Sequence, residues 1–161
     1  KNGTGGYNFS NRNPAGFGTP AQWSPDITLS GTQGFWLIPS GTPPASYEVA
    51  FLGEVPLREA YTNVLAEALT MTAFPYTADV AFSNTALYAN SQVGDVMWIW
   101  DPDKDGTGNY NFYTKNPAGF GTPAQWSNSG EFLIISQGTG LWYDHVGSGD
   151  LTIVDSRPYN P

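Results

Sequence analysis

The chain has 161 residues, a length typical of one domain or two small ones, and 40% of its residues are hydrophobic. Its six Trp, nine Tyr and nine Phe exclude a disordered chain, because they supply enough apolar area to offset the entropy lost on folding. A formal net charge of −8 opposes binding to nucleic acid and anionic membranes, and the absence of cysteine excludes disulfides and thiolate chemistry.

Short apolar runs rich in β-branched and aromatic residues alternate with clusters of Gly, Pro, Asn and Ser, a pattern typical of β-strands. The predicted strands, in chain order, are Gly6–Ser10, Gly34–Pro39, Tyr47–Leu52, Leu69–Phe74, Asp79–Phe82, Asp95–Asp101, Asn109–Thr114, Glu131–Ser136, Gly140–His145 and Leu151–Asp155. The spacing of glycines and prolines between them predicts an all-β, sandwich-like fold of antiparallel sheets.

One segment has a helical pattern instead. Its apolar residues recur at helical spacing, namely Leu57, Tyr61, Val64, Leu65, Ala68 and Leu69. Pro56 precedes them, where a helix can begin, and Pro75 follows. We therefore expect at most one short helix, near 57–67, in a linker that covers 57–68.

An internal repeat determines the organisation of the chain. Residues 13–24 and 116–127 both read NPAGFGTPAQWS, and over 1–24 and 104–127 the two copies are identical at 19 of 24 positions. The correspondence continues more weakly to residues 56 and 158. We predict that 1–56 is the rear half of a first β repeat and that 69–161 is a complete second repeat.

The front half of the repeat, residues 57–103, has a single copy in the sequence. The chain therefore contains two rear halves, 1–56 and 104–158, and opens in the middle of a repeat. Either the first front half was removed, or a neighbouring subunit supplies it. A half-unit that is completed by another subunit makes a head-to-tail contact, and such contacts propagate into fibres or rings.

The segment DPDKDGTGN is the best candidate for a metal site. Asp101, Asp103 and Asp105 occupy positions 1, 3 and 5 of a calcium loop, but Phe112 stands where that loop needs a bidentate Glu. The alternative is a solvated acidic turn. We expect no cofactor other than a weak structural calcium ion at these three residues.

Catalytic patterns are absent from the sequence. His145 is the single histidine, GxSxG does not occur, and the NPAGFGTPAQW segments lack the lysine of a phosphate-binding loop. We therefore expect that the protein is not an enzyme.

Aromatic residues in the repeated segments and at the chain end are the candidates for contacts between subunits. They are Phe17, Trp23, Phe120, Trp126 and Tyr159. Trp and Tyr rings also stack on the apolar faces of sugars, so polysaccharide is a second possible partner. Most aromatic residues of a β protein lie in its core, which is the simplest interpretation of many of the 24 here.

The order FPYTAD, GDVMWIWD, YNFY, GTGLW and RPYNP, which closes the chain at Pro158-Tyr159-Asn160-Pro161, resembles a group of uncharacterised exported bacterial proteins. These have tandem all-β repeats of about this length that end in Pro-Tyr-x-Pro. The resemblance implies an extracellular or cell-surface location and no particular activity. We therefore expect a structural subunit of an extracellular filament, tube, sheath or surface layer that assembles with copies of itself by β complementation. The alternative is a carbohydrate-binding or adhesive β module.

Overall fold

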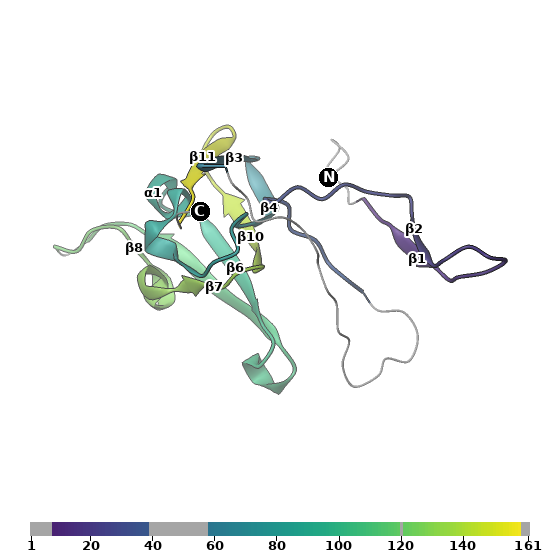
Figure 1. Cartoon of the computed structure of the whole chain (residues 1–161). Coiled ribbons are helices and arrows are strands. Elements are labelled where there is room, and N and C mark those ends of the chain that lie inside the picture. The colour runs from purple at the N-terminus through teal and green to yellow at the C-terminus, as the bar shows by residue number, and fades with distance from the viewer. Residues whose placement is uncertain (1–7, 39–57, 120, 159–161) are drawn as a thin grey trace. The chain divides into compact units, whose positions relative to one another are not determined.

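The computed structural model describes residues 8–38, 58–119 and 121–158. It divides into two compact units, Lys1–Ser30 and Gly31–Pro161, and each is considered by itself. Strands predominate in both units, so the prediction of an all-β fold of antiparallel sheets is confirmed (Figure 1).

The larger unit is organised around a five-stranded antiparallel sheet. Its strands, in spatial order, are β4 (Ala68–Ala73), β10 (Gly140–His145), β6 (Val96–Asp101), β7 (Asn109–Asn116) and β8 (Gln125–Trp126). Strands β4 and β6 come from the front half of the repeat, and β7, β8 and β10 come from the rear half. The two halves therefore build one sheet together, and neither forms it alone.

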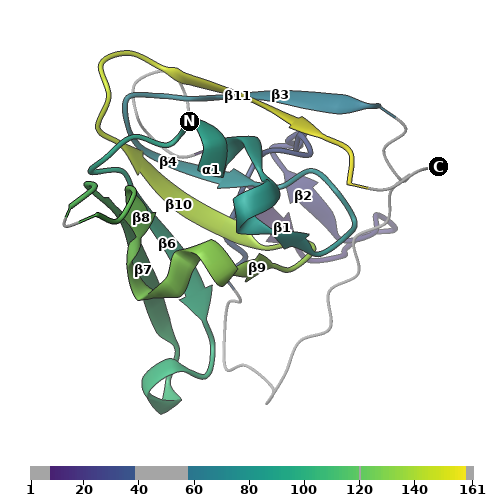
Figure 2. The same cartoon turned by 90° about the vertical axis from the view of Figure 1, so that its left-hand side faces the viewer.

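The described residues of the larger unit also form two further strand pairs and four short helices (Figure 2). The pairs are β3 (Ala60–Leu65) with β11 (Leu151–Ser156), and β5 (Val80–Ala81) with β9 (Ile134–Ile135). The helices are η1 (Phe82–Asn84), α1 (Ala86–Asn90), η2 (Lys104–Gly106) and η3 (Ser127–Phe132). Both strand pairs again join a front-half strand to a rear-half strand.

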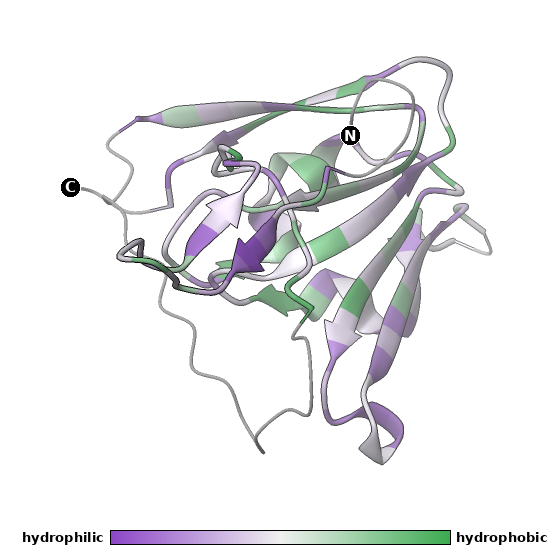
Figure 3. Cartoon of the chain, turned by 90° about the vertical axis from the view of Figure 1, so that its right-hand side faces the viewer, coloured by the Kyte–Doolittle hydropathy of each residue, from purple (hydrophilic) through white to green (hydrophobic). Residues whose placement is uncertain are grey.

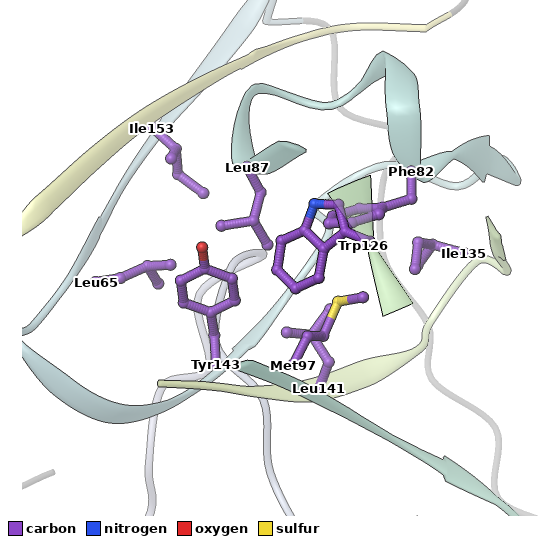
Figure 4. Packing of buried hydrophobic residues seen from close by; sticks show 9 residues of the cluster. All are labelled: Leu65, Phe82, Leu87, Met97, Trp126, Ile135, Leu141, Tyr143 and Ile153. Carbon is purple, nitrogen blue, oxygen red and sulfur yellow. The ribbon is translucent and has the colours of Figure 1, made fainter. Parts of the chain in front are cut away.

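The hydrophobic core lies between one face of the five-stranded sheet and the elements that cover it (Figure 4). Residues two apart on a strand share a face, so Leu141 and Tyr143 of β10 enter the core together and pair with Ile99 and Met97 of β6. The buried cluster consists of Leu65, Phe82, Leu87, Met97, Trp126, Ile135, Leu141, Tyr143 and Ile153.

A buried carboxylate joins the two halves at the end of the core. Asp95 is fully buried, and its Oδ2 accepts hydrogen bonds from the Tyr143 hydroxyl at 2.5 Å and from the Gln92 amide at 2.8 Å. Its Oδ1 accepts one from the Val146 amide at 3.0 Å and lies 3.1 Å from Nδ1 of His145. A buried carboxylate is tolerated when its oxygens are satisfied in this way.

The predicted helix at 57–67 is wrong, because the described part of this segment contains strand β3. Its side chains alternate, with Tyr61, Asn63 and Leu65 turned inward, and all six of its residues pair with β11. The helical spacing of the apolar residues is overridden by this pairing, and β-branched Thr62 and Val64 suit a strand. The helix that does form, α1, was not predicted; the Thr85 side chain accepts a hydrogen bond from the Tyr88 amide at its start.

Most of the other predicted strands in the larger unit are confirmed, as β4, β5, β6, β7, β10 and β11. The segment Glu131–Ser136 begins inside η3 and contains only the two-residue strand β9. Residues 34–38 of the predicted strand Gly34–Pro39 are not a strand, although Gln33 forms a β-bridge with Thr72. The segment Tyr47–Leu52 lies outside the described residues.

The smaller unit contains one β-ribbon, formed by β1 (Asn11–Asn13) and β2 (Gln22–Ser24). The prediction placed a strand at Gly6–Ser10, but the described residues 8–10 are not a strand. All six residues of β1 and β2 are exposed, and β1 is strongly hydrophilic (Figure 3). We call residues 10–25 the N-terminal ribbon and the equivalent residues 113–128 the C-terminal ribbon.

Candidate functional site

The two ribbons share their strand register. Arg12 pairs with Trp23 and Asn13 with Gln22 in the N-terminal ribbon, and the equivalent residues, 115 with 126 and 116 with 125, pair in the C-terminal ribbon. The repeated sequence therefore forms the same antiparallel register twice, in two different units of the chain.

The loops at the ribbon tips are also the same. Gly16 and Thr19 exchange two backbone hydrogen bonds of 3.1 and 2.9 Å, and Gly119 and Thr122 exchange two of the same lengths. In both loops the threonine hydroxyl donates to the glycine carbonyl at 2.6 Å. The glycine before each threonine has φ of +83°, a conformation that favours glycine. Local sequence alone thus determines the shape of the loop.

The tryptophan that the two ribbons have in common, Trp23 in one and Trp126 in the other, has different surroundings in each. Trp126 is only 3% exposed, and its ring lies 5.2 Å from the ring of Phe82 and 6.5 Å from that of Tyr143 (Figure 4). Glu131 accepts a hydrogen bond from the Trp126 amide. Trp23, by contrast, is 48% exposed.

A cation lies beside the buried tryptophan. Lys115 Nζ is 4.6 Å from the centre of the Tyr88 ring and 5.8 Å from that of Trp126, distances at which a cation is attracted to an aromatic face. We call the front-half residues here, Phe82, Leu87 and Tyr88, the Trp126 pocket, and Trp126 and Lys115 of the C-terminal ribbon occupy it. The N-terminal ribbon retains a cation at this position, as Arg12, which is exposed.

Three of the five candidates for subunit contacts are placed by the structure. Trp126 is buried in the core and is unavailable to another subunit in this arrangement, whereas Trp23 and Phe17 are exposed. Phe17 lies at the tip of the N-terminal ribbon with φ of +48°, an uncommon conformation for a bulky residue, and is fully exposed. Phe120 and Tyr159 lie outside the described residues.

A second aromatic group lies at one end of β6 and β7. The ring of Trp100 is 5.1 Å from that of Tyr110, its cross-strand partner, and Trp36 approaches both rings edge-on at 6.5 and 6.2 Å. Trp36 is 48% and Trp100 is 43% exposed. We call these three residues the aromatic patch.

The structure does not bring together the three candidate metal ligands in the acidic loop between β6 and β7. Asp101 accepts hydrogen bonds from the Asn111 side chain and the Asp103 amide, at 3.0 Å each, and these bonds lower its pKa. Asp105 accepts one from Asn109 at 2.9 Å. Within the described residues, no group of three or more acidic, His or Cys side chains is arranged to hold a metal ion.

His145, the single histidine, is the last residue of the predicted strand Gly140–His145. The structure buries His145 against Asp95, in the hydrogen-bond network that joins the two halves. The residues that sequence reasoning missed are those that cover Trp126, namely Phe82, Leu87 and Tyr88. The sequence signal available for them was Thr85 ahead of ALYAN, a helix N-cap that is easily overlooked in so short a helix.

Comparison of the chain with protein-family models, with curated protein sequences and with solved structures gave no match. The helices within the described residues are all too short or too polar to cross a membrane.

Proposed function

We propose that the protein is a structural, self-associating β-subunit whose N-terminal ribbon makes the contact between subunits. One observation carries this proposal: an identical twelve-residue sequence in the same strand register leaves Trp23 48% exposed where Trp126 is 3% exposed. Burying an aromatic side chain is strongly favourable, and Trp and Tyr are enriched where proteins associate. An exposed ribbon that carries a half-exposed Trp is therefore suited to contact another subunit.

The composition supports association between copies. Only 12% of the residues are charged, so few charged side chains must be desolvated when two surfaces meet. The net charge of −8 acts in the opposite direction and makes association stronger at high ionic strength. We propose an extracellular filament, tube, sheath or surface layer as the setting, as expected from the resemblance in sequence.

The test is electron microscopy together with sedimentation velocity, applied to the full chain over a range of concentrations. We expect the mass to rise with concentration and ordered particles to form, and we expect Trp23→Ala to reduce both. A matched control is Trp100→Ala, which removes an equally exposed tryptophan outside the ribbon. A chain that stays monomeric at every concentration and ionic strength would overturn the proposal.

A second candidate function is binding of a polysaccharide at the aromatic patch. Trp36, Trp100 and Tyr110 lie together, and Trp36 and Trp100 are both more than 40% exposed. Exposed aromatic rings are common components of a small-ligand site. Retention on immobilised polysaccharides that is lost in Trp36→Ala, but kept in Trp23→Ala, would support this function.

A further inference from the structure

We infer that the N-terminal ribbon of one copy binds the Trp126 pocket of a second copy, in competition with that copy's own C-terminal ribbon. The inference rests on the proposed function and identifies the partner surface. Residues 13–24 are identical in sequence to residues 116–127, and residues 116–127 already lie beside the Trp126 pocket in the same chain. Because the N-terminal ribbon has the same strand register, it can place Trp23 in the Trp126 pocket as the C-terminal ribbon places Trp126.

The contacts that the incoming ribbon would regain can be read from the C-terminal ribbon. Trp23 would take the place of Trp126 against Phe82, and Arg12 would take that of Lys115 beside Tyr88. An arginine stacks on an aromatic face at least as well as a lysine. The central contacts of the pocket are therefore preserved in the exchange.

The differences between the ribbons favour the resident one. Tyr113 packs against the core, whereas the smaller and polar Ser10 occupies this position in the N-terminal ribbon. Asp155 of the second rear half accepts a hydrogen bond from the amide of Ala86, the first residue of α1, and its sequence counterpart is Gly53. The N-terminal copy thus resembles the resident copy in its ribbon more than in the rest of the rear half, so we confine the exchange to the ribbon.

The resident ribbon has a further advantage because it is covalently attached to the front half. An attached segment acts at an effective concentration in the millimolar range. The 161 residues also carry two ribbons for one front half, so every exchange between copies releases one ribbon as it binds another. We therefore expect exchange to be reversible and to increase with protein concentration, as in domain swapping.

The most direct test uses the absence of cysteine from the chain. Val96 of β6 lies directly opposite Thr114, whose counterpart in the N-terminal ribbon is Asn11. Residues directly opposite in antiparallel strands are close enough for a disulfide after small adjustment. An Asn11→Cys chain mixed with a Val96→Cys chain should therefore form a disulfide-linked heterodimer. The control is Asn11→Cys mixed with Val64→Cys, a front-half site that is 53% exposed on β3. Equal cross-linking of the two mixtures, or none in either, would overturn the inference.

A second variant tests the competition without disturbing the resident core. Ser10→Tyr, Asn11→Thr and Arg12→Lys together give residues 10–24 the sequence of 113–127, and all three substitutions lie outside the larger unit. The regained aromatic contact should strengthen association by about tenfold in dissociation constant. No change in the dissociation constant would contradict the ribbon exchange. If wild-type chains associate but show neither the selective cross-link nor the tighter association of the triple variant, the ribbon exchange is wrong and the proposed function stands. If wild-type chains never associate, the proposed function is wrong as well.

Discussion

Trp23 and Trp126 are the eleventh residue of the same twelve-residue sequence, and they pair in the same register with a basic residue on the neighbouring strand. Nevertheless, one side chain is 48% exposed and the other is 3% exposed. The difference arises outside the ribbons, in the residues that surround each tryptophan. Phe82 of the front half packs 5.2 Å from Trp126, Leu87 belongs to the same buried cluster, and Tyr88 lies beside Lys115. Local sequence thus determines the shape of each ribbon, and the presence of a partner half determines whether its tryptophan is buried.

The two ribbons should differ most in how much stability the protein loses when the tryptophan of each ribbon is replaced by alanine. Trp126→Ala should lower the free energy of unfolding by about 3–5 kcal/mol, the usual cost of removing a buried aromatic side chain. Trp23→Ala should change it by less than about 0.5 kcal/mol in dilute solution, as for other surface substitutions. Urea unfolding followed by circular dichroism measures both.

A milder substitution separates ring packing from the indole N–H. Trp126 Nε1 is buried and has no hydrogen-bond partner within the described residues. Trp126→Phe keeps an aromatic ring in the pocket and removes this unsatisfied donor, so it should recover most of the stability lost in Trp126→Ala. Equal costs for Trp126→Ala and Trp23→Ala would contradict the account of the pocket.

The junction between front and rear halves is the next most sensitive point. Asp95→Asn replaces one acceptor oxygen by an NH₂ group, although four donors surround the carboxylate. We expect a loss of about 2–3 kcal/mol, since buried donors are left unsatisfied. Asp144→Asn, at a partly exposed position on the same strand as His145, should have little effect. Amide signals of the N-terminal ribbon should be unchanged in both variants, and a cooperative loss of them would show that the two units fold together.

The Asp155 carboxylate gives the larger unit a dependence on pH. Burial raises the pKa of Asp155 above its ordinary value of 3.8, and the hydrogen bond from the Ala86 amide lowers it by less. The folded protein therefore holds this proton to a higher pH than the unfolded chain does. As a result, the free energy of unfolding falls as pH rises from about 3.8 through the raised pKa.

Asp155→Asn should remove this component of the pH dependence while keeping an acceptor for the Ala86 amide. Unfolding at a series of pH values measures the difference, and Asp150→Asn, at an exposed position before the same strand, is the control. A steeper fall of stability with rising pH in Asp155→Asn than in the wild type would show that the sign is wrong.

The smallest expected effects fall on the ribbon tips, where the two copies should respond alike. Thr19→Val and Thr122→Val each remove a hydrogen bond from the threonine hydroxyl to a glycine carbonyl. Each should weaken its own loop by about 0.5 kcal/mol, because exposed hydrogen bonds contribute little. Faster amide exchange at Gly16 and Gly119, respectively, reports the loss. A clear response in only one loop would mean that the tips are not equivalent.

The parts of the fold that the sequence predicts are those with a strong local pattern. Strands β6, β10 and β11 have apolar and β-branched residues at strand spacing, and their pairing reinforces that pattern. The helical spacing of apolar residues in β3 gave a wrong prediction, because the pairing of β3 with β11 determines the structure of this segment. Strand β1 reads Asn-Arg-Asn and carries no hydrophobic signal at all, so the ribbon could be identified only through its twin.

The candidate site could be predicted only in part, for a related reason. The duplication identified Trp23 and Trp126 as equivalent residues, and the sequence also marked the front half as the part with one copy. Which of the two tryptophans is buried depends on Phe82, Leu87 and Tyr88, which lie about 40 residues before Trp126 in the chain. Convergence of such distant segments is a property of the folded core and is not visible in local periodicity.

We propose that Trp23 stays exposed until a second copy covers it, whereas Trp126 is covered within its own chain. Amide hydrogen exchange, resolved by residue with NMR at several protein concentrations, is the decisive measurement. In dilute solution, the amides of 22–24 should exchange much faster than those of 125–126, and rising concentration should slow the first set towards the second. Equal protection of the two ribbons in dilute solution, or protection of 22–24 that does not change with concentration, would contradict the account.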